Sequence, residues 1–161
     1  MTPSVDGKIG MLRHTLATLA YRGGKALRGA PPEFARYRVA PGTRTPLEIL
    51  AHIGDLLGWT LLMADGKHQW HNSAPLPWDE EIARFFAALE ALDRRLASGE
   101  ALGVPADNLF QGPIADALTH VGQIAMLRRM AGCAMSGENY FVAAIETGRA
   151  GADQAAPVKE F

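Results

Sequence analysis

The chain has 161 residues, of which 48% are hydrophobic, so it is long enough for one sizeable core and short for two. Its 16 basic and 17 acidic side chains give a formal charge of −1, which excludes a global field that would attract nucleic acid or anionic lipid. The single cysteine, Cys133, excludes an internal disulfide and a thiolate metal cage. The amino terminus lacks the pattern of an export signal, and we expect no segment apolar enough to cross a bilayer, so the sequence predicts a cytoplasmic protein without membrane contact.

Four stretches carry apolar residues at alternating spacings of three and four, the spacing of one buried face of a helix. The four faces are Ile9, Leu12, Leu16, Leu19, Gly23 and Ala26; Ile49, His52, Leu56, Trp59 and Met63; Ile82, Phe85, Leu89, Leu92 and Leu96; and Ala117, His120, Ile124, Leu127 and Ala131. No segment alternates apolar and polar residues as a half-buried strand does. The sequence therefore predicts an all-α protein, and two of its four buried faces contain a histidine.

Sequence signals at the helix ends give the boundaries. Thr45-Pro46-Leu47-Glu48 is a capping box with proline at the first helical position, so the second helix is predicted over residues 46 to 65. The third helix begins at the acidic segment 77–81 and ends at Ser98-Gly99. The fourth is predicted to open at Gly112-Pro113 and to end at Ala131-Gly132.

A short extra helix is predicted near the carboxyl end, from about Glu138 to Thr147, with Phe141 and Ile145 as its buried residues. We expect residues 1–150 to form a single helical-bundle domain and residues 151–161 to form a flexible tail, because that segment is small and polar.

The linkers at residues 29–44 and 66–78 are long for a simple up-and-down bundle. They predict a four-helix bundle with at least one crossover connection. Loops of this length could also supply the walls of a pocket.

The residues best suited to bind a metal are His52 and His120, which lie among apolar residues on two different helices. A buried imidazole needs partners for both ring nitrogens, and two imidazoles that face each other can share a metal ion. Asp116 lies one turn before His120, at the spacing where two side chains can chelate one ion. These three residues predict a metal site with open coordination positions, as a catalytic site has.

Structural explanations compete with this interpretation. Either histidine alone could be a core residue bonded to a backbone carbonyl, and Asp116 could be a carboxylate favoured in the first turn of its helix. Glu48, one turn before His52, is explained by its capping box and is left out of the predicted metal site.

Other chemically capable side chains receive structural interpretations. We expect the loop histidines, and the histidine that lies off the first apolar face, to be exposed at the surface. The helix dipole explains the two arginines near the end of their helix. The cysteine has no neighbour that would activate its thiol. These residues are His68, His71, His14, Arg128, Arg129 and Cys133.

The second and fourth helices resemble the two signature helices of the DinB/YfiT-like metalloenzyme family. The resemblance rests on residues 47–55, which read LEILAHIGD, and on residues 116–132, where His120-Val121-Gly122-Gln123 runs into Leu-Arg and a closing glycine. It extends over nearly the whole chain in helix order and spacing.

The resemblance implies a four-helix bundle with a crossover, a divalent transition metal and a homodimer. Zinc or nickel is the expected metal, with iron or manganese as alternatives. Family members of known activity include thiol-dependent transferases and isomerases, so a small-molecule substrate and a low-molecular-weight thiol are the expected partners. The family pattern places a histidine where this chain has Asp116, although the isomerase-like branch uses a carboxylate there. A carboxylate is a harder metal ligand than an imidazole, so it weakens the preference of the site for zinc.

Two functions follow as hypotheses. The first is a metal-dependent enzyme, a thiol-dependent transferase or isomerase or a hydrolase, in which the metal activates water or a thiol against a small electrophile. In this hypothesis Gln123 orients the ligands, and Tyr140 reaches a pocket. The alternative is a non-catalytic helical binding module that has kept the family fold. Nucleic-acid binding has no basic face to support it.

Overall fold

The structure, a computed structural model, describes residues 5–161, with side chains from residue 7 onward. Its helical elements are α1 (Val5–Leu27), η1 (Pro32–Arg36), α2 (Pro46–Ala64), α3 (Trp78–Ala97), α4 (Ala106–Leu109), η2 (Phe110–Ile114), α5 (Ala115–Met130) and η3 (Tyr140–Val142). The described residues contain no strand, only a single bridge between Glu138 and Glu160. The prediction of an all-α chain is confirmed.

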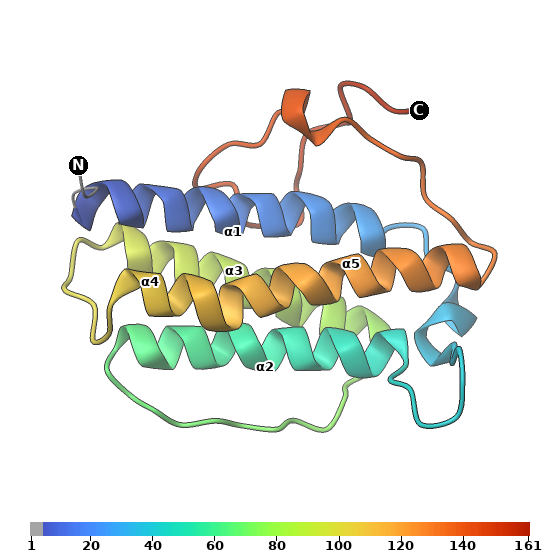
Figure 1. Cartoon of the computed structure of the whole chain (residues 1–161), viewed down its shortest axis with the longest axis horizontal. Helices are drawn as coiled ribbons and strands as arrows, with labels where there is room; N and C mark the ends of the chain where they lie inside the picture. The colour runs from blue at the N-terminus through green and yellow to red at the C-terminus, as the bar shows by residue number, and fades with distance from the viewer. Residues whose placement is uncertain (1–4) are drawn as a thin grey trace.

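The long helices α1, α2 and α3 and the continuous run of α4, η2 and α5 surround the core (Figure 1). Helices α1 and α2 each pack against both α3 and α5, so they occupy opposite corners of the bundle. The chain runs the same way along α2 and α3, and the connection between them therefore returns beside α2, toward the end at which α2 begins (Figure 1). This connection, residues 65–77, is the predicted crossover.

The second helix begins where its capping signal predicted. The Thr45 hydroxyl accepts a hydrogen bond from the Glu48 backbone N–H at 3.2 Å, and the Glu48 carboxylate accepts one from the Thr45 N–H at 2.6 Å. Both bonds satisfy donors that would otherwise be unpaired at the helix start. They account for Glu48, which takes no part in the site described below.

The prediction that the fourth helix opens at Gly112-Pro113 is wrong. The helical run begins at Ala106, passes through the π-helical segment η2, and continues without a break as α5 to Met130. Pro113 lacks an N–H and its ring collides with the carbonyl four residues earlier in a regular α-helix, and the wider π turn accommodates it. The proline therefore marks an irregular turn inside the helix.

The prediction of a helix over residues 138–147 is also wrong. Only the 3₁₀ turn η3 forms there, and Phe141, expected to be buried, is 96% exposed. The carboxylate of Glu138 is instead fully buried, where it accepts hydrogen bonds from Lys25 at 2.7 Å and from the Tyr21 hydroxyl. This anchor and the adjacent bridge to Glu160 hold the backbone in an extended conformation.

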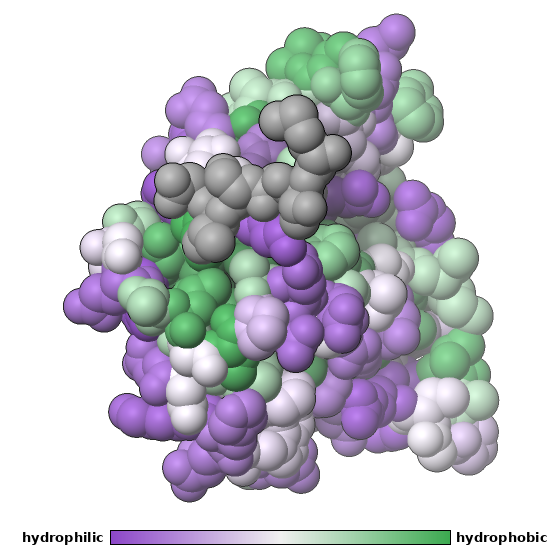
Figure 2. All heavy atoms as spheres, turned by 60° about the vertical axis from the view of Figure 1, so that its left-hand side comes forward, coloured by the Kyte–Doolittle hydropathy of each residue, from purple (hydrophilic) through white to green (hydrophobic). Residues whose placement is uncertain are grey.

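The carboxyl-terminal segment, residues 133–161, packs along α1. Ala150 is buried, and Glu160 makes an ion pair with Lys25 at 2.7 Å. Burial, together with the hydrogen bond to Glu138, raises the pKa of Tyr21 to about 12, so its hydroxyl keeps the proton that it donates. Figure 2 shows apolar side chains at the top of the molecule, where this segment lies. Its exposed apolar residues are Phe141, Val142, Val158 and Phe161.

Helix α2 is the most apolar element, and it corrects one expectation from the sequence. Its residues Pro46–Ala64 are long and apolar enough, by length and composition, to cross a membrane. Most of the helix is buried against its neighbours, with Leu50, Ile53 and Leu57 completely enclosed. A helix that packs against two others must be apolar around most of its circumference, which accounts for this composition.

Candidate metal centre

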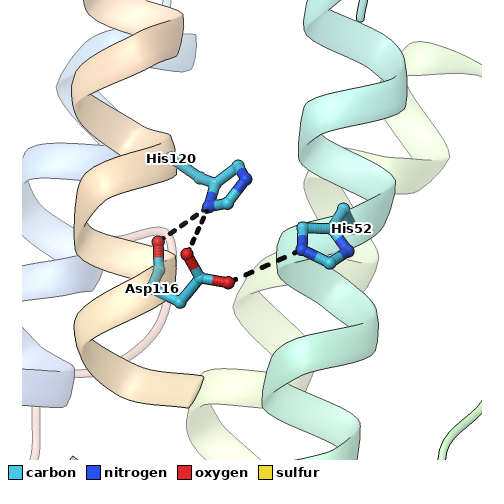
Figure 3. A group of neighbouring side chains, drawn as sticks. All are labelled: His52, Asp116 and His120. Carbon is cyan, nitrogen blue, oxygen red and sulfur yellow. Dashed lines mark hydrogen bonds and ion pairs between the residues drawn. The ribbon is translucent and has the colours of Figure 1, made fainter. Parts of the chain in front are cut away.

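His52 of α2 and the pair Asp116 and His120 of α5 meet between the two helices (Figure 3). One ligand atom of each side chain lies within 4.8 Å of those of the other two. The centroids of the two imidazole rings are 4.8 Å apart. Among the described residues this is the one group of at least three histidine, cysteine or carboxylate side chains close enough to share an ion.

The orientation of His120 favours metal binding. Its Nδ1 lies 2.8 Å from the backbone carbonyl oxygen of Asp116, and because a carbonyl can only accept, Nδ1 carries the hydrogen. The Nε2 atom is then left with a free lone pair. Metal-bound histidines commonly donate their other N–H to a carbonyl in this way, which fixes both the tautomer and the ring.

Asp116 lies between the two histidines. Its Oδ2 is 3.7 Å from His52 Nε2, and its Oδ1 is 3.2 Å from His120 Nδ1. The side chain is 45% exposed, so solvent or a substrate can reach it. Since the helical run begins ten residues earlier at Ala106, Asp116 is not at a helix start, and the positive end of the helix dipole does not explain it.

The surroundings of His52 disfavour its protonated form. Burial lowers the pKa of His52, and the nearby Arg44 and His120 lower it further, against an opposing effect of Asp116. The side chain is 20% exposed. An unprotonated imidazole offers a lone pair to a cation, so the lowered pKa of His52 favours its role as a metal ligand.

The donor set fits a divalent transition metal. Two donors that each lie about 2.0–2.2 Å from one tetrahedral ion are about 3.3–3.6 Å apart, so side-chain shifts of about an ångström would bring the widest separation here into range. Two imidazoles and a carboxylate suit zinc, nickel, iron and manganese, and they fill three positions of at least four. A further position is left for water or a substrate.

The crossover loop covers one side of this centre. The Trp70 ring lies edge-on to His52, with 5.8 Å between the ring centroids, and also edge-on to Trp59 at 5.6 Å. The sequence interpretation of this loop as solvated surface missed these contacts. A tryptophan in a polar loop was the available signal, because so large an apolar ring usually finds a partner.

Buried carboxylates hold the loop in place. Asp55, one turn after His52, has a side chain only 2% exposed; it accepts a hydrogen bond from the Ser73 N–H at 3.0 Å and pairs with Arg84. Glu81, which is fully buried, accepts one from the Leu76 N–H at 2.9 Å. Burial opposes the charge of Asp55, but the bonds from Ser73 and Arg84 prevail and lower its pKa.

Two pockets flank the centre along the groove between α2 and α5. The first, about 490 Å³, is lined by Asp116 and Thr119 together with Leu56 and Trp59. The second, about 390 Å³, lies one turn along α5 beyond His120 and is lined by Gln123 and Arg44 among apolar residues. Both are of a size that holds a small organic molecule.

Gln123 and Tyr140 do not lie with the three residues of the candidate centre. Gln123 is exposed and lines the second flanking pocket, without a hydrogen bond to His52, Asp116 or His120 in the described part of the chain. Tyr140 lines a different pocket, on the α1 side of α5. Their proposed roles in orienting ligands or contacting a substrate stay predictions.

The histidines given surface interpretations are exposed, whereas Arg128 has a structural role that the helix dipole did not predict. His14, His68 and His71 are exposed, and none belongs to the candidate centre. Arg128 is buried and donates hydrogen bonds to four backbone carbonyls, those of Ala26, Arg28, Gly29 and Cys133. Its role is to tie the end of α5 to the end of α1.

Fold and site together define an all-α bundle with a candidate metal centre between two antiparallel helices. Comparison with protein-family models, with curated proteins and with solved structures finds no match to this chain. The resemblance to the DinB/YfiT-like family therefore depends on the signature residues of α2 and α5 quoted above.

Proposed function

We propose that this protein is a metal-dependent enzyme of the DinB-like type, acting on a small-molecule electrophile with water or a low-molecular-weight thiol as the nucleophile. The observation that carries the proposal is the convergence of His52, Asp116 and His120 within 4.8 Å at a place with pockets on both sides. A metal bound there would supply a Lewis acid that lowers the pKa of the nucleophile. The protein would act in the cytoplasm, as a homodimer.

The residues of the chain contribute in distinct ways. His52 presents an imidazole whose pKa is lowered, mainly by burial, and the carbonyl of Asp116 holds the His120 ring in its orientation. The partly exposed carboxylate of Asp116 is the one anionic group of the three and would lower the net positive charge at a bound metal. Trp70 and Trp59 lie on the loop side of the centre, with the Trp70 ring against His52.

Elemental analysis of the purified full chain, produced without a histidine tag, tests the metal requirement. The proposal expects a transition metal near one equivalent per chain, or uptake of one equivalent of added zinc or nickel. Protein that contains no such metal and takes up none contradicts it.

The thiol requirement has a separate test. Protein loaded with cobalt(II) should gain a sulfur-to-cobalt charge-transfer band when a small thiol is added, and the Cys133→Ser variant should gain the same band, since that half-buried cysteine lies outside the centre. If the spectrum of the cobalt-loaded protein does not change when thiol is added, the nucleophile is water rather than a thiol.

A non-catalytic binding module is the second candidate, and one observation favours it. The hydrogen bond from His120 Nδ1 to the Asp116 carbonyl satisfies a buried histidine without any ion. In this case the His52→Ala variant changes core stability alone. In the enzyme it also abolishes metal uptake.

A further inference from the structure

A separate pocket of about 470 Å³ lies between α1 and α5 and is closed by the carboxyl-terminal segment. Its apolar wall includes Leu118 and Val121 of α5 and Met135. Leu118 and His120 point about 200° apart around their helix, so the pocket opens away from the metal centre. Its charged lining comes from Arg22 and Arg129, its other polar side chains are Thr119 and Tyr140, and no described acidic residue lines it.

The charges of the two arginines in this pocket are not neutralised by carboxylates. Arg22 lies over the Tyr140 ring, with its guanidinium carbon 4.2 Å from the centroid, and it makes no ion pair within residues 5–161. Arg129 donates one hydrogen bond, to the Ala125 carbonyl of its own helix at 3.2 Å. By contrast, Arg13 is paired with Asp93. The pocket is therefore an electropositive place with apolar walls.

The wall formed by the carboxyl-terminal segment is fixed before any ligand arrives. Glu138, two residues before Tyr140, is anchored by Lys25 and Tyr21 in the buried cluster described above. Tyr21 also packs edge-on against the Tyr140 ring, with 6.2 Å between centroids. A wall held in this way has little conformational freedom to lose on binding, which favours affinity.

We propose that this pocket binds a small organic anion, a carboxylate with an apolar body, through Arg22 and Arg129. The planar guanidinium matches a carboxylate in two parallel hydrogen bonds, and the apolar walls bury the hydrocarbon part of the ligand. The volume lies within the range of small-molecule sites. None of His52, Asp116 and His120 lines this pocket, so a ligand here does not occupy the metal centre, although the pocket shares Thr119 with the one beside Asp116.

Calorimetric titration of the metal-free full chain with 4-phenylbutanoate and with its neutral amide tests the proposal. The carboxylate should bind at millimolar concentration or below, and the amide should bind about tenfold more weakly, because it lacks the charge-assisted bonds. Arg22→Gln and Arg129→Gln should each weaken carboxylate binding by about tenfold. Both side chains are exposed, so neither variant disturbs the core.

The matched control is Arg36→Gln, which removes one positive charge from an exposed position in η1 that lines none of the pockets described. It should leave binding unchanged. Three outcomes contradict the proposal: no binding of the carboxylate, equal binding of acid and amide, or equal losses in Arg36→Gln and Arg22→Gln. Because metal is absent throughout, these results do not depend on the proposed enzyme activity.

Discussion

Replacing His52 by alanine should separate the contribution of metal to stability from that of packing. His52 supplies one of three donors, and its loss leaves Asp116 and His120, two ligands from a single helix, which bind an ion much more weakly. The ion would then no longer connect α2 to α5. A ligand that binds only the folded protein at a concentration of a hundred times its dissociation constant stabilises the fold by about 2.7 kcal/mol.

For a chain of 161 residues, each kcal/mol changes the melting temperature by about 2–4 °C, so saturating metal should raise Tm by about 5–10 °C. In the His52→Ala variant this increment should disappear. The metal-free variant should lose only about 1–2 kcal/mol, since the side chain is 20% exposed and its removal leaves a small, open gap.

The assay is thermal unfolding followed by circular dichroism, with and without zinc or nickel, after treatment with a chelator. His14→Ala is the control, because it removes an exposed histidine from α1, outside the candidate centre. The reasoning is refuted if the wild-type chain shows no increment with any transition metal, or if His14→Ala loses as much of the increment as His52→Ala.

Three further predictions concern the surroundings of the centre. The pKa of His52 is lower in the folded chain, so the unfolded chain binds more protons than the folded one below about pH 6.5. The metal-free protein should therefore lose stability as pH falls through that value. Urea unfolding of the His52→Gln variant should show a smaller loss. Nickel or copper should quench tryptophan emission, and Trp70→Phe should remove most of the quenching, because Trp70 lies against His52. Arg84→Ala leaves the buried Asp55 without its cation and should cost about 2–3 kcal/mol in urea unfolding, whereas a cost below about 0.5 kcal/mol would show that the pair does not hold the fold.

The parts of the fold that the sequence predicted correctly are those controlled by local patterns. The capping box placed the start of α2, and the three-and-four spacing identified the buried faces of all four helices. His52 and His120 were found in the same way, because a polar residue among apolar ones on a buried face must point inward. Asp116 followed from its spacing to His120 alone.

The parts that were missed depend on contacts between distant segments. Pro113 reads as a helix start in isolation, and only the packing of α4 and η2 against the bundle keeps the chain helical through it. Residues 138–147 have helical spacing, but the burial of the Glu138 carboxylate with Lys25, 113 residues away, prevails over that local preference. Neither interaction leaves a signal within one stretch of sequence.

The candidate centre and the crossover loop are mechanically connected through α2. His52 and Asp55 are three residues apart and hence neighbours on the helix surface; His52 faces α5 and Trp70, while Asp55 holds the loop that carries Trp70. A small rotation of α2 would therefore displace a ligand and its aromatic cover together. Most of the same helix is buried, and such a rotation is opposed by the close packing of its core face. The apolar composition of α2 thus serves the site as well as the core, because it holds His52 and the loop in one fixed relation to Asp116 and His120.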